Sequence, residues 1–224
     1  MEEHTIRVPR TARYYTLGRV RDPEELWICC HGYGQLAAEF ASHLSPLDDG
    51  RRLVVVPEAL SRFYVDDPAK EHGSESPVGA TWMTRAARLQ EIADYVGYLD
   101  LLCDAVRTSL EREPMVVCAL GFSQGAATAS RWATMGQERV SRLVLWGGAL
   151  PPDLDLDAAR DRLEAIDITV VVGDRDRYAS AGRLRELDER LGSVAVPYRL
   201  LRFEGGHRLD ADVLSMLGSG RDGR

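Results

Sequence analysis

A strand, a tight turn and a helix around Ser123 constrain the fold of this chain more than any other stretch. The apolar run Met115–Leu120 predicts a strand that is buried on both faces. The segment Gln124–Met135 is rich in Ala and Thr at helical spacing, which predicts a helix packed closely on the sheet. Between them lies Gly121-Phe122-Ser123-Gln124-Gly125, a Gly-x-Ser-x-Gly motif in which glycines leave the room that a strained turn needs. We therefore predict that Ser123 is a nucleophile.

Segments with the patterns of strands and helices alternate through the rest of the chain. Strands are expected over residues 26–30, 53–56, 140–146, 168–172 and 196–203, and helices over 35–45, 89–111, 158–165, 181–191 and 209–217. Two further short strands, over 5–9 and 13–17, are expected to pair antiparallel at the sheet edge. The alternation predicts one α/β domain over residues 1–224, with a mostly parallel central sheet and helices on both faces.

One long stretch, residues 58–84, follows neither the helical nor the strand period. It mixes aromatic and charged side chains. An aperiodic stretch of this length inside a compact domain is more often functional than merely connecting. The sequence leaves the role of this charged loop open.

Charge and composition limit the kinds of partner. The chain carries a net charge of -7, whereas nucleic acid and anionic membranes need a positive protein face, so neither is expected as a partner. The start has no apolar core like that of a signal peptide, and no stretch approaches the length of a membrane span, which favours a cytoplasmic protein without stable membrane insertion. Neither Cys-x-x-Cys nor His-Glu-x-x-His occurs, so no metal site is expected.

A serine nucleophile needs a histidine to take its proton, and the histidine needs a carboxylate to hold its tautomer. Hydrolases with this kind of turn place the three in the order serine, acid, histidine. Of the five histidines only His207 follows Ser123, and it lies in a Gly-Gly loop just past a predicted strand. The acid should follow the preceding strand, where Asp174 and Asp176 both fit. Because His207 must be neutral to act as a base, activity is expected to fall in acid.

The oxyanion of the tetrahedral intermediate needs two preorganised N–H donors. One is expected to be the backbone N–H of Gln124, directly after the nucleophile. The other should come from the loop after an early strand, where the segment His31-Gly32-Tyr33-Gly34 makes the N–H of Tyr33 the natural candidate. His31 is then interpreted as a residue that braces this loop and not as a base.

The same loop carries a competing signal. The residues from Gly32 to Ala37 fit Gly-x-Gly-x-x-Ala after a strand, and Glu58 ends the next strand at a plausible distance for a ribose contact. This pattern is typical of dinucleotide binding. It explains neither the serine turn nor the loops that carry Asp176 and His207, so we place it below the hydrolase interpretation.

Taken together, these motifs resemble the α/β-hydrolase superfamily and, within it, the phospholipase/carboxylesterase family that includes acyl-protein thioesterases. The matching pieces follow the order of that family and are His31-Gly32-Tyr33-Gly34, Trp82, Gly121-Phe122-Ser123-Gln124-Gly125, Trp146, Gly173-Asp174-Arg175-Asp176 and His207. In that family the acid is the second aspartate of Gly-Asp-x-Asp, which points to Asp176. The resemblance implies an α/β-hydrolase fold and hydrolysis of carboxylic esters or thioesters through an acyl-enzyme, without a cofactor.

The substrate is less constrained than the chemistry. The chain departs from the family at Met83, where an aromatic residue is usual, and in the residues that follow Asp176. Few residues separate the strands that end near Trp146 and begin near Ile168, so no large lid domain is expected. An open cleft of this kind suits small or medium acyl esters or thioesters, with Trp82, Met83 and Trp146 as candidate lining residues. We expect a monomer or a homodimer.

Two alternatives remain beside the esterase hypothesis. A dienelactone-hydrolase-like enzyme would keep the serine chemistry and change the substrate to a cyclic ester. A non-catalytic protein with the same fold would use the cleft for binding alone, and Ser123 would then not react with a fluorophosphonate.

Overall fold

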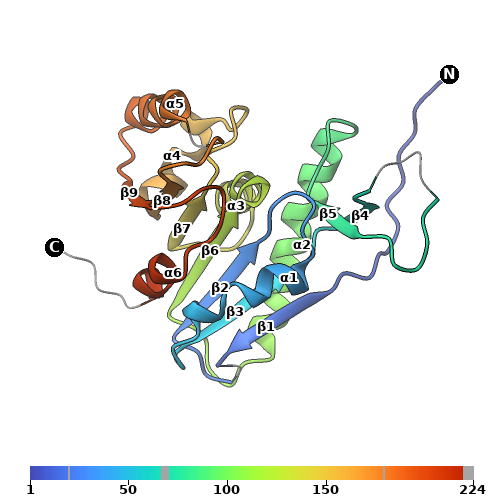
Figure 1. Cartoon of the computed structure of the whole chain (residues 1–224), viewed down its shortest axis with the longest axis horizontal. Helices are drawn as coiled ribbons and strands as arrows, with labels where there is room; N and C mark the ends of the chain where they lie inside the picture. The colour runs from blue at the N-terminus through green and yellow to red at the C-terminus, as the bar shows by residue number, and fades with distance from the viewer. Residues whose placement is uncertain (20, 67–70, 179, 219–224) are drawn as a thin grey trace.

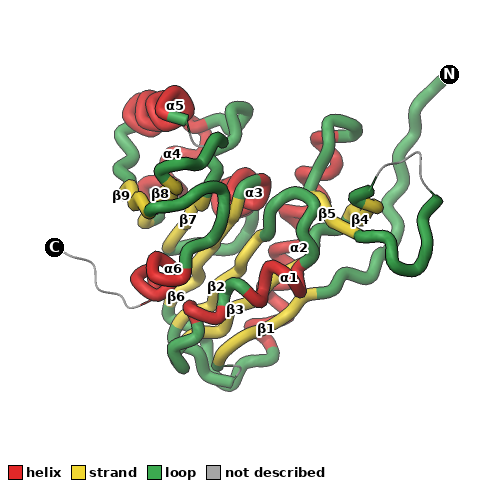
Figure 2. Tube along the Cα trace, viewed as in Figure 1, coloured by secondary structure: helices red, strands yellow, loops and turns green. Residues whose placement is uncertain are grey.

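The computed structural model describes residues 1–19, 21–66, 71–178 and 180–218 (Figures 1 and 2). A sheet of seven strands runs in the order β1-β3-β2-β6-β7-β8-β9. The strands are β1 (Tyr14–Gly18), β2 (Glu25–Cys30), β3 (Arg52–Pro57), β6 (Val116–Phe122), β7 (Arg142–Trp146), β8 (Asp167–Gly173) and β9 (Arg199–Phe203). Only β1 pairs antiparallel among these strands, with β3, and the other neighbours are parallel.

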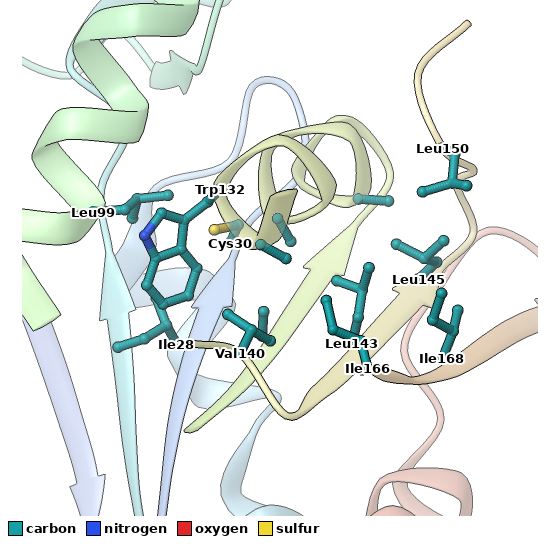
Figure 3. Close-up of a cluster of buried hydrophobic side chains, with 14 of the residues drawn as sticks. Ile28, Cys30, Leu99, Trp132, Val140, Leu143, Leu145, Leu150, Ile166 and Ile168 are labelled. Carbon is teal, nitrogen blue, oxygen red and sulfur yellow. The ribbon is translucent and has the colours of Figure 1, made fainter. Parts of the chain in front are cut away.

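Helices cover both faces of this sheet and enclose two hydrophobic cores. The helices are α1 (Ala37–Ser42), α2 (Arg88–Thr108), α3 (Gln124–Met135), α4 (Leu156–Glu164), α5 (Ala181–Ser193) and α6 (Ala211–Gly218), with a 3-10 turn, η1, at Ser45–Leu47. Alternate residues of β2 face opposite sides: Ile28 packs under α2 and α3 (Figure 3), and Trp27 packs with α1 and α6. In the described ranges, no helix is both long and apolar enough to cross a bilayer.

The architecture confirms the predicted α/β-hydrolase fold, with its mostly parallel sheet. The connection from β7 to β8 holds α4 and no inserted domain, as expected. The predicted strand over residues 5–9 is wrong, because this segment is exposed and lies outside the sheet. Its apolar members Ile6 and Val8 are 86% and 70% exposed, so the alternation there has no surface against which to bury one face.

The aperiodic stretch contains structure that its sequence does not indicate. Two short strands, β4 (Ser61–Tyr64) and β5 (Val78–Thr81), form an antiparallel pair outside the main sheet. The β5 strand lies against the loop after β2: the N–H of Gly34 donates to Ala80 O at 2.9 Å, and the N–H of Ala80 donates to Gln35 O at 3.2 Å. A side chain on Gly79 would lie 2.4 Å from Gly34 O, so glycine is required there. The hairpin thereby fixes the loop that follows β2.

The glycines of the serine motif let the first turn of α3 approach the sheet. A Cβ on Gly121 would lie 2.1 Å from Gly125 O, and one on Gly125 would lie 2.1 Å from Cys30 O, the last residue of β2. Both contacts are with backbone, which has little freedom to move away. This close approach brings the strand end, the helix N-terminus and the serine turn together.

Two glycine-to-alanine variants should therefore change stability in opposite directions. Gly125→Ala should lower the free energy of unfolding by at least about 3 kcal/mol through overpacking. Gly97→Ala should raise it by about 0.5–1 kcal/mol, because Gly97 is exposed within α2, has open space around its Cα and gains helix propensity. Urea unfolding at constant m-value measures both. Equal effects of the two substitutions would contradict the packing argument.

Candidate active site

Ser123 lies on the turn between β6 and α3 in a backbone conformation that few non-glycine residues adopt. Its φ is 55° and its ψ is -114°. The turn is held on both sides, since the N–H of Ser123 donates to Trp146 O at 2.8 Å and its carbonyl accepts from the N–H of Ala126 at 3.0 Å. The side chain borders a cavity of about 540 Å³. A strained turn that presents a hydroxyl to a cavity is the geometry of an exposed nucleophile.

His207 and Asp176 form a hydrogen-bonded pair at the same edge of the sheet. His207 follows β9 and Asp176 follows β8. The Nδ1 atom of His207 lies 2.8 Å from Oδ2 of Asp176, and the other carboxylate oxygen accepts from the N–H of Tyr178 at 2.8 Å. The carboxylate is 2% exposed and the imidazole 21%. This arrangement places the hydrogen on Nδ1 and leaves Nε2 as the acceptor of the neutral ring.

The imidazole of His207 is also fixed by packing. Its ring centroid lies 4.8 Å from that of Phe122 and 4.7 Å from that of Tyr178. Phe122 directly precedes Ser123, so this contact places the histidine beside the turn. Gly147 has a φ of 58°, and a Cβ there would lie 3.0 Å from two atoms of the imidazole. The absence of a side chain at Gly147 therefore leaves room for the imidazole at the end of β7.

Asp174, the other aspartate of the β8 loop, has a different set of partners. Its Oδ1 accepts from the N–H of Gly205 at 2.8 Å, within the loop that carries His207. The two loops are joined further by hydrogen bonds from Asp174 N–H to Phe203 O and from Arg175 N–H to Gly205 O. Asp174 thus holds the histidine loop in place, while Asp176 contacts the histidine itself.

The two backbone donors predicted for an oxyanion make no hydrogen bond to the described residues. Gln124 is the first residue of α3, where an N–H has no intrahelical acceptor. In the loop after β2, the N–H of Gly32 donates to the Gln35 side chain and that of Gly34 to Ala80 O. Tyr33 lies between these two glycines. In the described part of the chain, its N–H group and that of Gln124 donate to no protein acceptor. Both remain available to an anion.

The side chain of Gln124 has a role that sequence reasoning missed. Its amide oxygen lies 3.1 Å from the N–H of Trp82, and its amide nitrogen donates to Met83 O at 2.9 Å. The hydroxyl of Thr81 lies within hydrogen-bonding distance of both ends of the amide. The residue after the serine therefore attaches the end of β5 to the start of α3. Only the pairing of two segments over 40 residues apart reveals this function.

Of the three residues proposed to line the cleft, only Met83 borders the cavity. Trp82 is 3% exposed and Trp146 is 1% exposed, and both lie in the hydrophobic cores. The indole N–H of Trp82 donates to His31 O, and that of Trp146 donates to Arg208 O, each at 2.9 Å. These indoles support the loops around the cavity from behind and do not line it.

His31 is buried and holds its loop, in agreement with its interpretation as a brace. Nδ1 lies 2.8 Å from Gly32 O, and Nε2 accepts from the N–H of Ala59 at 3.1 Å. Glu58, the residue of the dinucleotide pattern, is 1% exposed and accepts from Arg13, Arg62 and the N–H of Ala37. Its carboxylate is committed inside the protein and is not free to contact a ribose. This geometry gives the dinucleotide hypothesis no support.

Burial lowers the pKa of His31, and this shift makes stability depend on pH. The unfolded chain takes up a proton at this position at a higher pH than the folded protein does. The contribution of His31 to the free energy of unfolding is therefore fully present above the ordinary histidine pKa of about 6.5. It is lost as the pH falls below that value, with a slope of at most about 1.4 kcal/mol per pH unit. Burial opposes ionisation of Glu25 and Glu58, but hydrogen bonds lower both pKa values, so these two groups affect stability at lower pH than His31. The donors are Trp27 and Arg52 for Glu25, and Arg13 and Arg62 for Glu58.

A His31→Gln variant should consequently be less stable than the wild type at pH 7.5 but lose less of its stability between pH 7.5 and 5.5. Glutamine offers an acceptor to Ala59 N–H and a donor to Gly32 O without a titrating group in this range. Urea unfolding of both proteins at the two pH values gives the comparison. An equal loss in both proteins would show that His31 does not carry the pH dependence.

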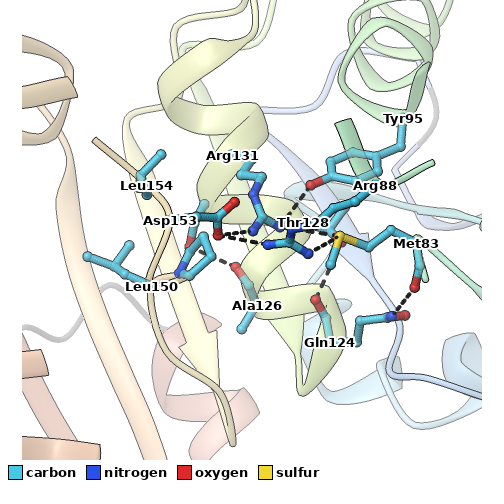
Figure 4. A network of polar contacts seen from close by, with 12 residues as sticks. Met83, Arg88, Tyr95, Gln124, Ala126, Thr128, Arg131, Leu150, Asp153 and Leu154 are labelled. Atoms are coloured by element: carbon cyan, nitrogen blue, oxygen red, sulfur yellow. Dashed lines mark hydrogen bonds and ion pairs between the residues drawn. The ribbon is translucent and has the colours of Figure 1, made fainter. Parts of the chain in front are cut away.

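The cavity beside Ser123 has a wall that no motif indicates. The charged residues that border it, among those the structure describes, are Arg88, Arg131, Arg183, Arg190 and Glu186. Arg88 and Arg131 converge on Asp153 and Met83, as Figure 4 shows. Arg88, Arg131 and Asp153 come from α2, α3 and the loop after β7, so their proximity depends on the tertiary fold.

Comparison with known proteins agrees with this fold. The chain superposes on acyl-protein thioesterase 2 of Zea mays with a TM-score of 0.68 and 16% sequence identity, over 92% of this chain and 98% of that one. A carboxylesterase of Mesorhizobium loti gives 0.66 at 15% identity, over 93% and 95%. A phospholipase/carboxylesterase of Dyadobacter fermentans gives 0.65 at 16% identity, over 96% and 98%.

Sequence comparison identifies the family. No curated protein sequence matches the chain. A family model described as serine hydrolase (FSH1) matches residues 24–211, which include the serine turn, both aspartates of the β8 loop and His207. Because this match spans most of the chain, the protein belongs to the FSH1 serine hydrolase family.

Proposed function

We propose that the protein hydrolyses carboxylic esters or thioesters through an acyl-enzyme on Ser123. One observation carries this proposal: His207, bonded to the buried carboxylate of Asp176, packs against Phe122, the residue before Ser123. A neutral imidazole oriented in this way is the base that a serine hydroxyl requires. Membership of a serine hydrolase family supports the same assignment.

The geometry suggests a role for each group in acylation. The Oγ atom of Ser123 attacks the carbonyl carbon and gives its proton to Nε2 of His207, while Asp176 holds the hydrogen on Nδ1 and stabilises the imidazolium. The carbonyl oxygen takes up the negative charge and accepts hydrogen bonds from the free N–H groups of Tyr33 and Gln124. Collapse of the intermediate breaks the ester bond, and the alcohol or thiol leaves with the proton from His207.

Deacylation repeats the sequence with water as the nucleophile. His207 takes a proton from water as the water oxygen attacks the acyl carbon. Breakdown of this second intermediate releases the carboxylic acid, and the proton on His207 returns to Ser123. The cycle uses the protein's own residues and water.

The size of the cavity supports acyl substrates of small or medium size, and the structural neighbours support ester and thioester chemistry. The volume of about 540 Å³ lies within the range of ligand pockets. The three neighbours are, by name, an acyl-protein thioesterase, a carboxylesterase and a phospholipase/carboxylesterase. Both oxygen esters and thioesters are therefore proposed as substrates.

Covalent labelling tests the function directly. A fluorophosphonate probe should add one label to the wild-type protein, and mass spectrometry of the digested protein should place it on Ser123. Protein denatured before exposure to the probe serves as the control, since an isolated serine hydroxyl is a poor nucleophile. A native protein that takes no label would favour the non-catalytic alternative.

A further inference from the structure

The cavity beside Ser123 is positively charged although the chain as a whole is negative. Among the described residues, its four arginines outnumber the acidic groups on or next to the lining, which are Glu186, Asp153 and Asp176. The chain has a net charge of -7. Positive charge concentrated in a concave site attracts an anionic ligand, even when the protein as a whole is negative.

Two of these arginines, Arg88 and Arg131, share a single carboxylate, whereas the guanidinium group of Arg190 is occupied by three backbone carbonyls. Arg131 comes from α3 and is 3% exposed, and Arg88 begins α2 and is 33% exposed. Both donate to the same oxygen of Asp153, at 2.6 Å from Arg131 and 2.8 Å from Arg88. One carboxylate thus serves two guanidinium groups, and one positive charge is left over. An anionic ligand at this pair would supply the second negative charge, and the burial of Arg131 strengthens that interaction.

The remaining donors of these two arginines have weak acceptors. Nη1 of Arg88 lies 3.1 Å from the sulfur of Met83, and Nη1 of Arg131 lies 3.7 Å from the same sulfur (Figure 4). A thioether accepts hydrogen bonds poorly. Nη1 of Arg131 also lies 3.1 Å from the hydroxyl of Tyr95, which is neutral. A carboxylate offers these N–H groups stronger acceptors in the planar geometry that guanidinium groups favour.

Apolar side chains share the lining of the cavity with the serine and the arginines. Ala127, Leu150 and Leu187 border the same cavity as Ser123 and Arg131. Met83 connects the two ends, because its carbonyl accepts from the side chain of Gln124 while its sulfur contacts the arginines. A short methylene chain suits such a surface.

We propose that the substrate is an ester that carries a carboxylate, which binds Arg88 and Arg131 while the ester carbonyl lies at Ser123. This inference rests on the proposed function and narrows its substrate class to carboxylate-bearing esters, such as half-esters of dicarboxylic acids. The single uncompensated charge of the arginine pair matches one carboxylate.

Matched substrates test the proposal on the wild-type enzyme. The 4-nitrophenyl half-ester of adipic acid and 4-nitrophenyl hexanoate differ mainly in a terminal carboxylate, and rates with Ser123→Ala provide the blank. A charge-assisted hydrogen bond predicts a kcat/KM about 10- to 100-fold higher for the charged ester. A second pair, 4-acetoxybenzoate and 4-acetoxybenzamide, places the carboxylate on the alcohol side. Preference for the charged member of either pair supports the proposal and tells which side of the ester carries the anion.

Substitutions should shift the ratio of kcat/KM between charged and neutral ester in opposite directions. Arg88→Gln should lower this ratio by about tenfold or more, and Asp153→Asn should raise it by removing the competing carboxylate. Arg160→Gln is the matched control, since Arg160 lies on α4, pairs with Glu164 and does not border the cavity. It should leave the ratio unchanged.

The failures are distinguishable. If a fluorophosphonate labels Ser123 and the neutral esters are cleaved at least as fast as both charged ones, this inference is wrong and the proposed function stands. If Ser123 takes no label and no ester is cleaved, both are wrong. A preference that survives Arg88→Gln and is unaffected by Asp153→Asn also overturns the assignment to this pair.

Discussion

The Ser123→Ala variant is expected to hydrolyse 4-nitrophenyl esters with a kcat about 10⁵- to 10⁶-fold below that of the wild type. Removal of the hydroxyl removes the atom that forms the acyl bond, and the free N–H groups of Tyr33 and Gln124 alone stabilise only a direct attack by water. Steady-state kinetics and fluorophosphonate labelling measure the loss. Ser42→Ala is a control, because Ser42 is exposed on α1 and its hydroxyl only donates to Glu39 O. Comparable hydrolysis by both variants would remove Ser123 from the mechanism.

The strained backbone of Ser123 adds a second measurement to the same position. A φ of 55° costs a non-glycine residue of the order of 1–3 kcal/mol. Ser123→Gly should be as inactive as Ser123→Ala, and it should unfold at a higher urea concentration than that variant. Higher stability together with lost activity would indicate that the fold keeps this strain for the sake of the reaction.

Much of the fold could be predicted because its signals are local. The strand β6 and the helix α3 were expected from an apolar run and a small-residue helix, and α3 has the predicted bounds, Gln124–Met135. Strands buried on both faces have continuous apolar sequences, which makes them easy to recognise. The glycines of the motif also identified the close contact between β6 and α3, since no other residue fits there.

The hairpin of β4 and β5 could not be predicted because non-local contacts stabilise it. Its strands have four residues each and are separated by a long connection. Alternation is weak in such short segments, and pairing with the loop at Gly34 and Gln35 fixes β5. The wrong prediction over residues 5–9 has the opposite cause. The local alternation there is clear, but the segment has no neighbouring strand or core on which to bury its apolar side chains.

The candidate site likewise contains residues that the sequence predicts and residues that only the tertiary fold reveals. Chain order placed Ser123, His207 and two candidate acids, Asp174 and Asp176, after strands of one parallel sheet, whose carboxyl ends meet at one edge. The resemblance to a known family then pointed to Asp176. The identity of residues that line the cavity depends on side-chain direction, so the sequence could not distinguish the buried Trp82 and Trp146 from the lining residue Met83. The cluster formed by Arg88, Arg131 and Asp153 joins three separate segments, and no local sequence pattern indicates it.

Asp176→Asn should lower kcat by about 10⁴-fold with the fold intact. Asparagine has the shape of aspartate, and its oxygen can still accept from the N–H of Tyr178. Its NH₂ group would then face Nδ1 of His207 and donate to it, which requires the hydrogen of the imidazole to move to Nε2. That tautomer cannot accept the proton of Ser123. The thermal midpoint should change little, so the loss in kcat is separable from a loss of structure.

Asp174→Asn supplies the matched comparison, and its expected effect on kcat is less than about tenfold. Asp174 accepts one hydrogen bond, from the N–H of Gly205, and the oxygen of asparagine can accept it as well. Asp174→Ala, which removes the acceptor, should act through stability by loosening the loop that carries His207. The two aspartates differ in what they contact, because Asp176 binds the imidazole of His207 and Asp174 binds the loop that carries it. If Asp174→Asn caused the larger loss in kcat, the role of orienting the histidine would have to be assigned to Asp174.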